Sequence, residues 1–201
     1  MIGRVAEGSE SSSRDTLVPA GLLGPVLLVI SWTVTRAVLF AQTFSGDTPA
    51  DVQAYARWAQ DAIAGLSPAA DTAFVYPPGA VALFLVVDVI PTDSYFRSFT
   101  LFAALVDLVI LFSLWWVVRR ASLRQRLAPW VWVALGLAAG PLMYERFDIF
   151  AALLGVLAML SLHRPLIAGA WAGLGFMVKL WPEIALLGVA RQHLARAAGG
   201  D

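Results

Sequence analysis

The sequence contains no cysteine and little charge. Its 201 residues include 14 Lys or Arg and 14 Asp or Glu, so the formal net charge at pH 7 is zero. Without cysteine the chain can form no disulfide, no thiolate zinc site and no cysteine nucleophile. Nucleic-acid-binding proteins carry a basic excess, so this balance makes nucleic acid an unexpected partner.

Several motifs of soluble enzymes are also missing. There is no G-x-G-x-x-G after a strand, no P-loop, no H-E-x-x-H and no G-x-S-x-G. His163 and His193 flank apolar runs without the spacing of metal ligands. The sequence therefore predicts neither a nucleotide pocket nor a protein-bound metal. If the chain is a transferase, its donor is expected to be carried by a lipid.

Apolar residues, in contrast, are abundant. They make up 59% of the chain, against about 45–50% in soluble domains. We therefore expect an all-α integral membrane protein, a polytopic helical bundle of about five or six membrane segments. The predicted parts are a disordered cytoplasmic tail (1–16), a membrane domain (17–190) and a second tail (191–201). The predicted spans are 17–41 (a signal anchor), 98–118, 128–143, 147–162 and 166–190, the last interrupted at Lys179.

Two segments in the first outer loop differ from these spans. In 42–75, Thr48 is predicted to cap a helix that begins with Pro49 and carries Asp51 in its first turn. Apolar residues at helical spacing make this an amphipathic helix on the membrane surface, ending near Gly65. Residues 76–91 are apolar, but a helix of this length reaches only about 24 Å of the roughly 30 Å hydrocarbon core. They form either an interfacial or re-entrant helix or a cramped span.

The distribution of arginine decides between these two possibilities. If 76–91 does not cross, the cytoplasmic side carries Arg4, Arg14, Arg119, Arg120, Arg124, Arg126 and Arg164, and the outer side carries Arg57, Arg97 and Arg146. If it crosses, most arginines lie outside. The positive-inside rule favours the first topology, with a cytoplasmic N-terminus in the plasma membrane. The outer face then gathers Asp47, Asp51, Asp61, Asp71, Asp88, Asp93, Glu145 and Asp148.

The surface helix offers a catalytic interpretation and a structural one. Asp51, with Asp47 as the alternative, is a candidate general base at the outer interface. Tyr55 and Trp58 lie one or two turns further on and could stack on a sugar ring. In the structural interpretation, Asp51 is simply the acidic residue of a capping box.

Three further positions are candidates for substrate binding. Tyr76 opens a Tyr-Pro-Pro-Gly turn that either starts a helix or positions a lipid headgroup. Arg146 either binds a phosphate bidentately or forms a local salt bridge with Glu145 or Asp148. Lys179 interrupts an apolar run just before Trp-Pro, which indicates a helix break near the interface or a functional cation.

Two charged residues fall within predicted spans. Arg36, near the end of the first run, is expected to extend toward the headgroups. Asp107, near the middle of 98–118, should face the bundle and find a partner, since an unpaired charge there is costly. Ser113 or a tryptophan of another span is the expected partner, and a proton relay is the alternative.

The order of these features resembles a known family. It is similar to the polyprenyl-phosphate-sugar-dependent glycosyltransferases of superfamily C, most closely family 87, the actinobacterial mannosyltransferase type. The resemblance extends over residues 17–190. Its motifs are Asp51-x-x-x-Tyr55-x-x-Trp58, Phe74-Val75-Tyr76-Pro77-Pro78-Gly79, Gly140-Pro141, Arg146-Phe147-Asp148 and Gly173-Leu174-Gly175-x-x-x-Lys179-Leu180-Trp181-Pro182.

The resemblance implies a specific chemistry. A hexosyl group, mannosyl in many members, passes with inversion from a polyprenyl-phosphate sugar to a lipid or polysaccharide acceptor at the outer membrane face. The acidic residue of the first outer loop, here Asp51 or Asp47, is the implied base. Arg146 or Lys179, or alternatively a divalent metal, would stabilise the leaving phosphate.

Family members are longer than this chain, so we expect it to be the N-terminal part of such an enzyme, without the later spans that complete the lipid groove. Two other functions compete with the transferase. A non-catalytic membrane subunit or remnant would transfer no sugar. A small transporter would line a path through mid-membrane with charges such as Asp107 and Lys179, whereas most charges here cluster at one face.

Overall fold

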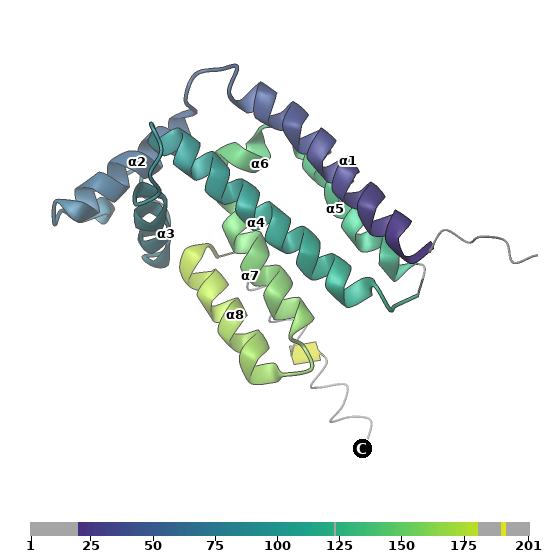
Figure 1. Cartoon of the computed structure of the whole chain (residues 1–201). Coiled ribbons are helices and arrows are strands. Elements are labelled where there is room, and N and C mark those ends of the chain that lie inside the picture. Colours follow the sequence, from purple (N-terminus) through teal and green to yellow (C-terminus); the bar gives the residue numbers. More distant parts are fainter. Residues whose placement is uncertain (1–19, 123, 181–189, 192–201) are drawn as a thin grey trace, which may run out of the picture.

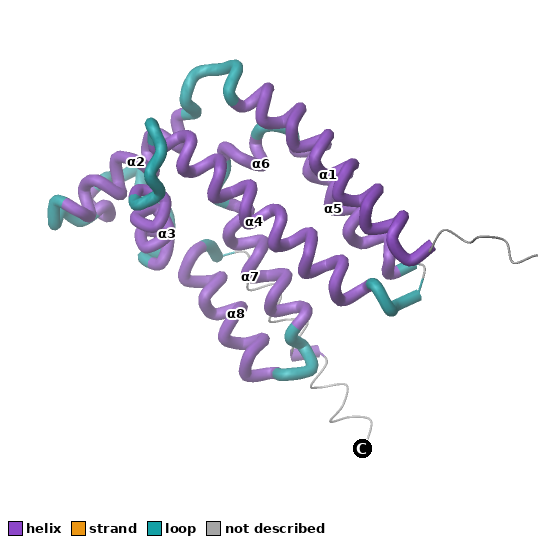
Figure 2. Tube along the Cα trace, viewed as in Figure 1, coloured by secondary structure: helices purple, strands orange, loops and turns teal. Residues whose placement is uncertain are grey.

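The computed structural model describes residues 20–122, 124–180 and 190–191, and all regular structure within them is helical. Figure 1 traces the chain and Figure 2 shows its helices and loops. The predicted all-α class is confirmed. The predicted tail 1–16, and all but the first residue of the predicted tail 191–201, lie outside the described residues. The helices are α1 (Ala20–Thr43), α2 (Ala50–Ile63), η1 (Pro68–Ala70), α3 (Gly79–Asp88), α4 (Tyr95–Val118), η2 (Gln125–Leu127), α5 (Ala128–Ala139), α6 (Leu142–Glu145), α7 (Asp148–Leu160) and α8 (Pro165–Val178).

α1 and α4 are the two long helices. Each contains 24 residues, or about 36 Å of helix, which is enough to cross a hydrocarbon core of about 30 Å. Among the described residues, only these two helices combine the length and the apolar character of a membrane span. Large apolar side chains such as Val34 and Leu105 remain more than half exposed on them, as they would on a lipid-facing surface.

α5, α7 and α8 are shorter than the spans predicted for them. They contain 12, 13 and 14 residues, which corresponds to about 18–21 Å. α5 ends early because Gly140 takes a left-handed conformation (φ 63°), and α6 starts after Pro141. α5 packs against α1 and α4, α7 against α4, and α8 against α7. The bundle therefore has two helices of membrane-spanning length, and five or six complete spans remain a prediction.

α2 is the predicted amphipathic helix, and it starts one residue later than expected. Pro49 has an extended backbone (φ −58°, ψ 142°) and precedes the helix, so Thr48 does not cap it. Instead, the Gln53 side chain donates to the Thr48 carbonyl at 2.7 Å. The capping-box interpretation of Asp51 is therefore wrong, because the N-cap residue is Pro49, which has neither a side-chain acceptor nor a backbone N–H for a reciprocal pair.

α3 stays at one end of the molecule. Its ten residues correspond to about 15 Å, half of the hydrocarbon core. It begins against the end of α8, where a Cβ on Gly79 would lie 2.5 Å from the Met177 carbonyl oxygen, so only glycine allows this approach. The Tyr95 hydroxyl donates to the Phe84 carbonyl at 3.2 Å and ties α3 to the start of α4. α2, α3 and the start of α4 lie together in Figure 1, as expected for a segment that does not cross.

An aromatic cluster joins α2, α3, α4 and the start of α7. Tyr55 stacks on Phe84 with ring centroids 4.9 Å apart, and Phe84 lies 5.0 Å from Phe147. Phe99 of α4 lies 5.5 Å from Tyr55. All four side chains are buried. Each aromatic pair contributes about 0.5–1.5 kcal/mol beyond its buried area, so the cluster fixes the surface helix α2 on the bundle.

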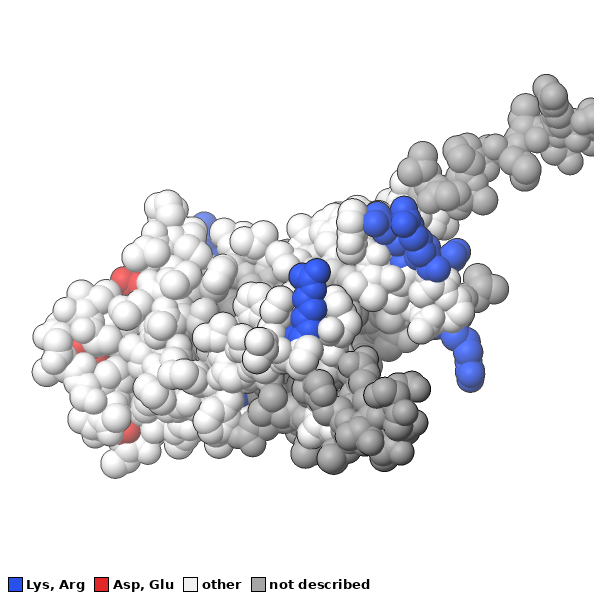
Figure 3. Space-filling view, turned by 90° about the horizontal axis from the view of Figure 1, so that it is seen from below, with Lys and Arg blue, Asp and Glu red and all other residues white. Residues whose placement is uncertain are grey.

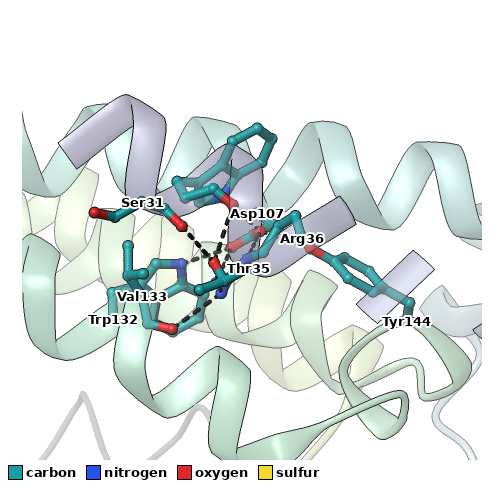
Figure 4. A network of polar contacts seen from close by, with 8 residues as sticks. Ser31, Thr35, Arg36, Asp107, Trp132, Val133 and Tyr144 are labelled. Carbon is teal, nitrogen blue, oxygen red and sulfur yellow. Dashed lines mark hydrogen bonds and ion pairs between the residues drawn. The ribbon is translucent and has the colours of Figure 1, made fainter. Parts of the chain in front are cut away.

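Asp107 of α4 lies at the centre of a buried polar network (Figure 4). Its carboxylate accepts five hydrogen bonds, from Trp32 Nε1 (2.8 Å), Arg36 Nε (2.8 Å), Arg36 Nη2 (3.3 Å), Trp132 Nε1 (2.7 Å) and the Tyr144 hydroxyl (2.8 Å). These donors come from α1, α5 and α6. The network therefore connects four helices through one charge. The structural role predicted for Asp107 is confirmed, with two tryptophans as partners in place of Ser113.

The position of Arg36 corrects a prediction. Its side chain is 1% exposed and does not reach the headgroups. Nη1 donates to the Val133 carbonyl at 3.0 Å, and the guanidinium lies where a Cβ on Gly136 would be. A charge in mid-membrane is costly when unpaired, and the ion pair with Asp107 compensates both residues at once.

Candidate functional site

Four charged side chains and one tyrosine meet at the end of the molecule that carries α2 and α3. Arg146 Nε lies 2.8 Å from Asp51 Oδ2, and Lys179 Nζ lies 2.6 Å from Asp148 Oδ1. Lys179 Nζ is also 5.7 Å from the centre of the Tyr76 ring. We call these five residues the charged corner. The acidic segment after α1 and the Arg-Phe-Asp turn, which the sequence placed on the same face, are thus in contact in the structure.

Each charged residue of the corner lies at a helix boundary. Asp51 is in the first turn of α2 and Asp148 is the first residue of α7, where the helix dipole favours a carboxylate. Arg146 lies between α6 and α7 in extended backbone (φ −112°, ψ 144°). Lys179 directly follows α8, also in extended backbone, which confirms the predicted break at this residue. The ends of four helices thus bring charges from distant parts of the sequence together.

Asp51 is incompletely satisfied. Its side chain is 38% exposed, but Oδ2 is buried and accepts no hydrogen bond from the described residues. The Nε of Arg146 is close to this oxygen, and its N–H is not directed at it. A buried acceptor without a hydrogen bond costs about 1–3 kcal/mol. Oδ2 is therefore held by the charge of Arg146 rather than by a hydrogen bond, while the exposed part of the Asp51 side chain is accessible to a proton donor.

Asp47, the alternative base, lies elsewhere. It is exposed in the loop between α1 and α2. No hydrogen bond or ion pair among the described residues links it to the charged corner. The geometry therefore favours Asp51 over Asp47.

Tyr55 and Trp58 lie beneath the corner rather than on its surface. Their side chains are 1% and 3% exposed, so neither ring is accessible to a sugar in this structure. The Tyr55 hydroxyl is 3.1 Å from the Tyr76 hydroxyl. Burial, and then this hydrogen bond, raise the pKa of Tyr55, which keeps the hydroxyl protonated. The two residues hold Tyr76 and α2 in place, a supporting position that the predicted sugar stacking did not anticipate.

Asp71 anchors the loop that follows α2. Its carboxylate accepts hydrogen bonds from the Ala73 backbone N–H (2.9 Å), Trp58 Nε1 (2.9 Å) and Arg57 Nη2 (3.0 Å). The Ala73 N–H, followed by Trp58 and Arg57, lowers the pKa of Asp71. The sequence places Asp71 in a loop but gives no signal of this role, because its donors depend on how the loop folds back on α2.

An apolar groove opens beside the charged corner. It has a volume of about 290 Å³ and runs between α5, α6 and α7. Arg146 and Asp148 lie at its charged side, and the remaining lining residues are apolar: Trp132, Ala139, Leu142, Met143, Ile149 and Ala152. A second, open hollow of about 350 Å³ adjoins Lys179 and is lined by Val75, Tyr76, Pro77, Lys179 and Leu180. The corner thus adjoins a surface suited to a lipid chain.

The site offers cations more readily than metal ligands. Within the described residues, no group of three or more His, Asp or Glu side chains is close enough to hold a metal ion. Asp51 and Asp148 each already face a cation. Among the described residues of this corner, Arg146 and Lys179 carry the positive charge that can balance a bound phosphate.

Fold and site together define a class, a protein whose described residues form an all-helical bundle with two helices of membrane-spanning length and a charged corner beside an apolar groove. The model of glycosyltransferase family 87 matches residues 74–200, more than half of the chain. The chain therefore belongs to glycosyltransferase family 87, and the resemblance noted in the sequence is confirmed. No curated protein and no solved structure matches the chain significantly.

Only some of the candidate site residues lie within the range that the family model matches. Tyr76, Arg146, Asp148 and Lys179 lie within it. Asp47, Asp51, Tyr55 and Trp58 precede it, so the case for Asp51 as the base depends on its contact with Arg146.

Proposed function

We propose that this protein transfers a hexosyl group, specifically mannosyl, from a polyprenyl-phosphate sugar to a lipid or glycan acceptor at the outer face of the plasma membrane. Membership of glycosyltransferase family 87 supports the transfer of a sugar. The proposed donor, acceptor and base are supported by the contact of Asp51 with Arg146 at the edge of an apolar groove. It combines a proton acceptor, a phosphate-binding cation and a surface for a lipid chain.

In the proposed reaction, the acceptor hydroxyl oxygen forms a bond to the anomeric carbon while the bond from that carbon to the phosphate oxygen breaks. Asp51 takes the proton from the hydroxyl, and the bonding electrons leave with the polyprenyl phosphate. Attack from the face opposite the phosphate inverts the anomeric carbon. One base is sufficient for this step.

Arg146 has two partners in this proposal. In the structure it pairs with Asp51, and a phosphate in the groove would compete for the same guanidinium. When Arg146 turns to the phosphate, the Asp51 carboxylate is released to accept a proton. The leaving phosphate gains negative charge, which Arg146 and Lys179 stabilise. Donor binding thus prepares the base.

The orientation of the protein follows from its charges. Basic side chains gather at the end of the molecule where α4 ends and acidic side chains at the opposite end (Figure 3). The positive-inside rule assigns the basic end to the cytoplasm. We infer a multi-pass protein whose N-terminus is cytoplasmic and whose charged corner faces outward.

The substitution Asp51→Asn tests the proposed base. The amide cannot accept the hydroxyl proton, so we expect transfer from a radiolabelled polyprenyl-phosphate mannose to membrane acceptors to fall about 10²–10⁴-fold. Asp61→Asn is the matched control, because it removes a carboxylate from the same helix away from Asp51 and should leave transfer within about twofold.

Three results would contradict the proposal in different ways. Full activity of Asp51→Asn with loss of activity in Asp47→Asn would move the base to Asp47. Full activity of both variants would exclude a base in this segment. Membranes containing the wild-type protein that transfer no mannose from the donor would favour the non-catalytic subunit.

A further inference from the structure

The basic end of the molecule contains a second lined cleft, far from the charged corner. It has a volume of about 270 Å³ and lies between the start of α1, the end of α4 and the start of α5. The lining residues are Gly24, Pro25, Leu28, Trp115, Val118, Arg119, Arg126, Pro129 and Trp130. Two arginines and two tryptophans therefore surround a mainly apolar floor.

The arginines of this cleft are held in place, and neither forms an ion pair with another described residue. The Arg119 guanidinium lies 3.3 Å above the centre of the Trp116 ring, and Arg126 Nε donates to the Ala121 carbonyl at 3.0 Å. The sequence contains no Asp or Glu between Asp107 and Glu145. The cleft therefore offers a positive charge that the surrounding segment does not cancel.

A second, apolar space adjoins the cleft between α1 and α4. A smaller hollow of about 40 Å³ is lined by Pro25, Leu28, Val29, Leu111, Phe112 and Trp115. Pro25, Leu28 and Trp115 line both spaces, so the two are neighbours. The hollow leads from the arginines toward the middle of the two membrane-length helices.

We propose that this cleft binds one anionic phospholipid, with its headgroup phosphate at Arg119 and Arg126 and an acyl chain along Leu28 and Phe112. The arginines match a phosphate in charge, and the guanidinium fork can bind it bidentately. Tryptophans such as Trp115 and Trp130 concentrate at the depth of lipid headgroups. A soluble anion would use only the basic half of the cleft. This proposal is independent of the sugar-transfer chemistry.

Native mass spectrometry of the detergent-solubilised full chain tests the site. The protein is titrated with phosphatidylglycerol and, separately, with phosphatidylethanolamine of the same acyl chains. We expect one phosphatidylglycerol to bind preferentially, and Arg119→Gln/Arg126→Gln to weaken it roughly 30-fold. Arg120→Gln/Arg124→Gln removes the same charge from the same loop at residues that do not line the cleft. At 0.2 M salt, where charges more than about 8 Å apart are screened, this control should change binding less than about threefold.

Each alternative result decides against the proposal. Equal weakening in both arginine pairs would mean that the loop attracts lipid only through its surface charge. Equal binding of phosphatidylethanolamine would mean that the charge of the headgroup is not recognised. Displacement of phosphatidylglycerol by millimolar inorganic phosphate would show that the apolar half of the cleft takes no part in binding. The same conclusion would follow if Phe112→Ala left binding unchanged and short-chain lipid also bound. Unchanged size-exclusion profiles in detergent verify that the variants fold.

Discussion

The Arg36–Asp107 pair inside the bundle and the Asp51–Arg146 pair at its outer end have the same chemistry in different surroundings. The first pair is 1% and 0% exposed, and its carboxylate accepts five hydrogen bonds. In the second pair, the arginine and aspartate side chains are 54% and 38% exposed, and one carboxylate oxygen accepts no hydrogen bond. The Asp107 carboxylate is fully hydrogen-bonded, whereas the Asp51 carboxylate has one oxygen that accepts no hydrogen bond from the described residues.

This difference separates a structural charge from the one that we propose to be reactive. A buried carboxylate whose acceptor sites are all filled cannot take a proton or a ligand without losing several bonds, so it fixes the helices that donate to it. An exposed ion pair contributes only about 0–1 kcal/mol, so Asp51 and Arg146 can separate at little cost. Breaking the Arg36–Asp107 pair is therefore expected to lower mainly stability, and breaking the Asp51–Arg146 pair mainly activity.

The largest expected effect is that of Asp107→Ala. It leaves Arg36 buried without its counter-ion, which costs about 3–5 kcal/mol. Thermal unfolding in detergent should show a large loss of stability. The double variant Arg36→Met/Asp107→Leu should recover much of it, because no charge then remains unpaired. A single variant as stable as the wild type would remove the distinction between the two pairs.

Arg146→Ala should show the opposite pattern. Loss of one donor to a developing phosphate charge lowers turnover about 10²-fold, whereas loss of an exposed pair changes the free energy of unfolding by at most about 1 kcal/mol. Steady-state kinetics and unfolding of the same preparation measure both quantities. Arg97→Ala is the control, since Arg97 forms an exposed ion pair with Asp93 at the same end of the protein. Comparable losses of turnover in the two variants would contradict a specific role for Arg146.

Gly136→Ala tests how rigidly the buried pair is held. The added Cβ would overlap the Arg36 guanidinium, and overpacking of this kind costs about 1–3 kcal/mol. Gly169→Ala places the same methyl group in open space on α8 and should not destabilise the protein. If both variants unfold at the wild-type temperature, the guanidinium can move, and the network is less rigid than its hydrogen bonds indicate.

The smallest effect concerns Asp71 and pH. Its pKa is lowered in the folded protein, so its contribution to stability is complete above the unfolded value of about 3.9 and is lost as pH falls through the folded value. The protection of the amides of residues 66–75 against hydrogen exchange, measured relative to the intrinsic exchange rate at each pH, should fall as the pH is lowered through this range. Asp71→Asn should exchange faster already at neutral pH. Exchange that is the same in both proteins at every pH would show that Asp71 does not anchor the loop.

Much of the architecture could be read from local patterns. Helical spacing of apolar residues after Asp51 predicted the amphipathic helix α2, the short apolar run predicted a helix shorter than a membrane span, and Lys179 marked the end of α8. Helix starts and lengths were less accurate. Pro49 precedes α2 instead of beginning it, and Gly140 ends α5 before it reaches membrane-spanning length, because backbone angles at such boundaries depend on the neighbouring elements.

The pairing of charges required the tertiary structure. The sequence indicated that Asp107 needs a partner, but the spacing between Arg36 and Asp107 contains no signal that they meet. It also placed Asp51 and Arg146 on one face through the positive-inside rule, without showing that they touch. Burial of Tyr55 and Trp58 likewise depends on α3, α4 and α7 closing over α2.

The sequence by itself determined the helical class, the apolar character and the family resemblance, because periodicity, composition and short motifs are local properties of a chain. Only the tertiary structure decided that the carboxylate of Asp107 is fully hydrogen-bonded and that of Asp51 is not, because the hydrogen-bond donors come from helices distant in sequence.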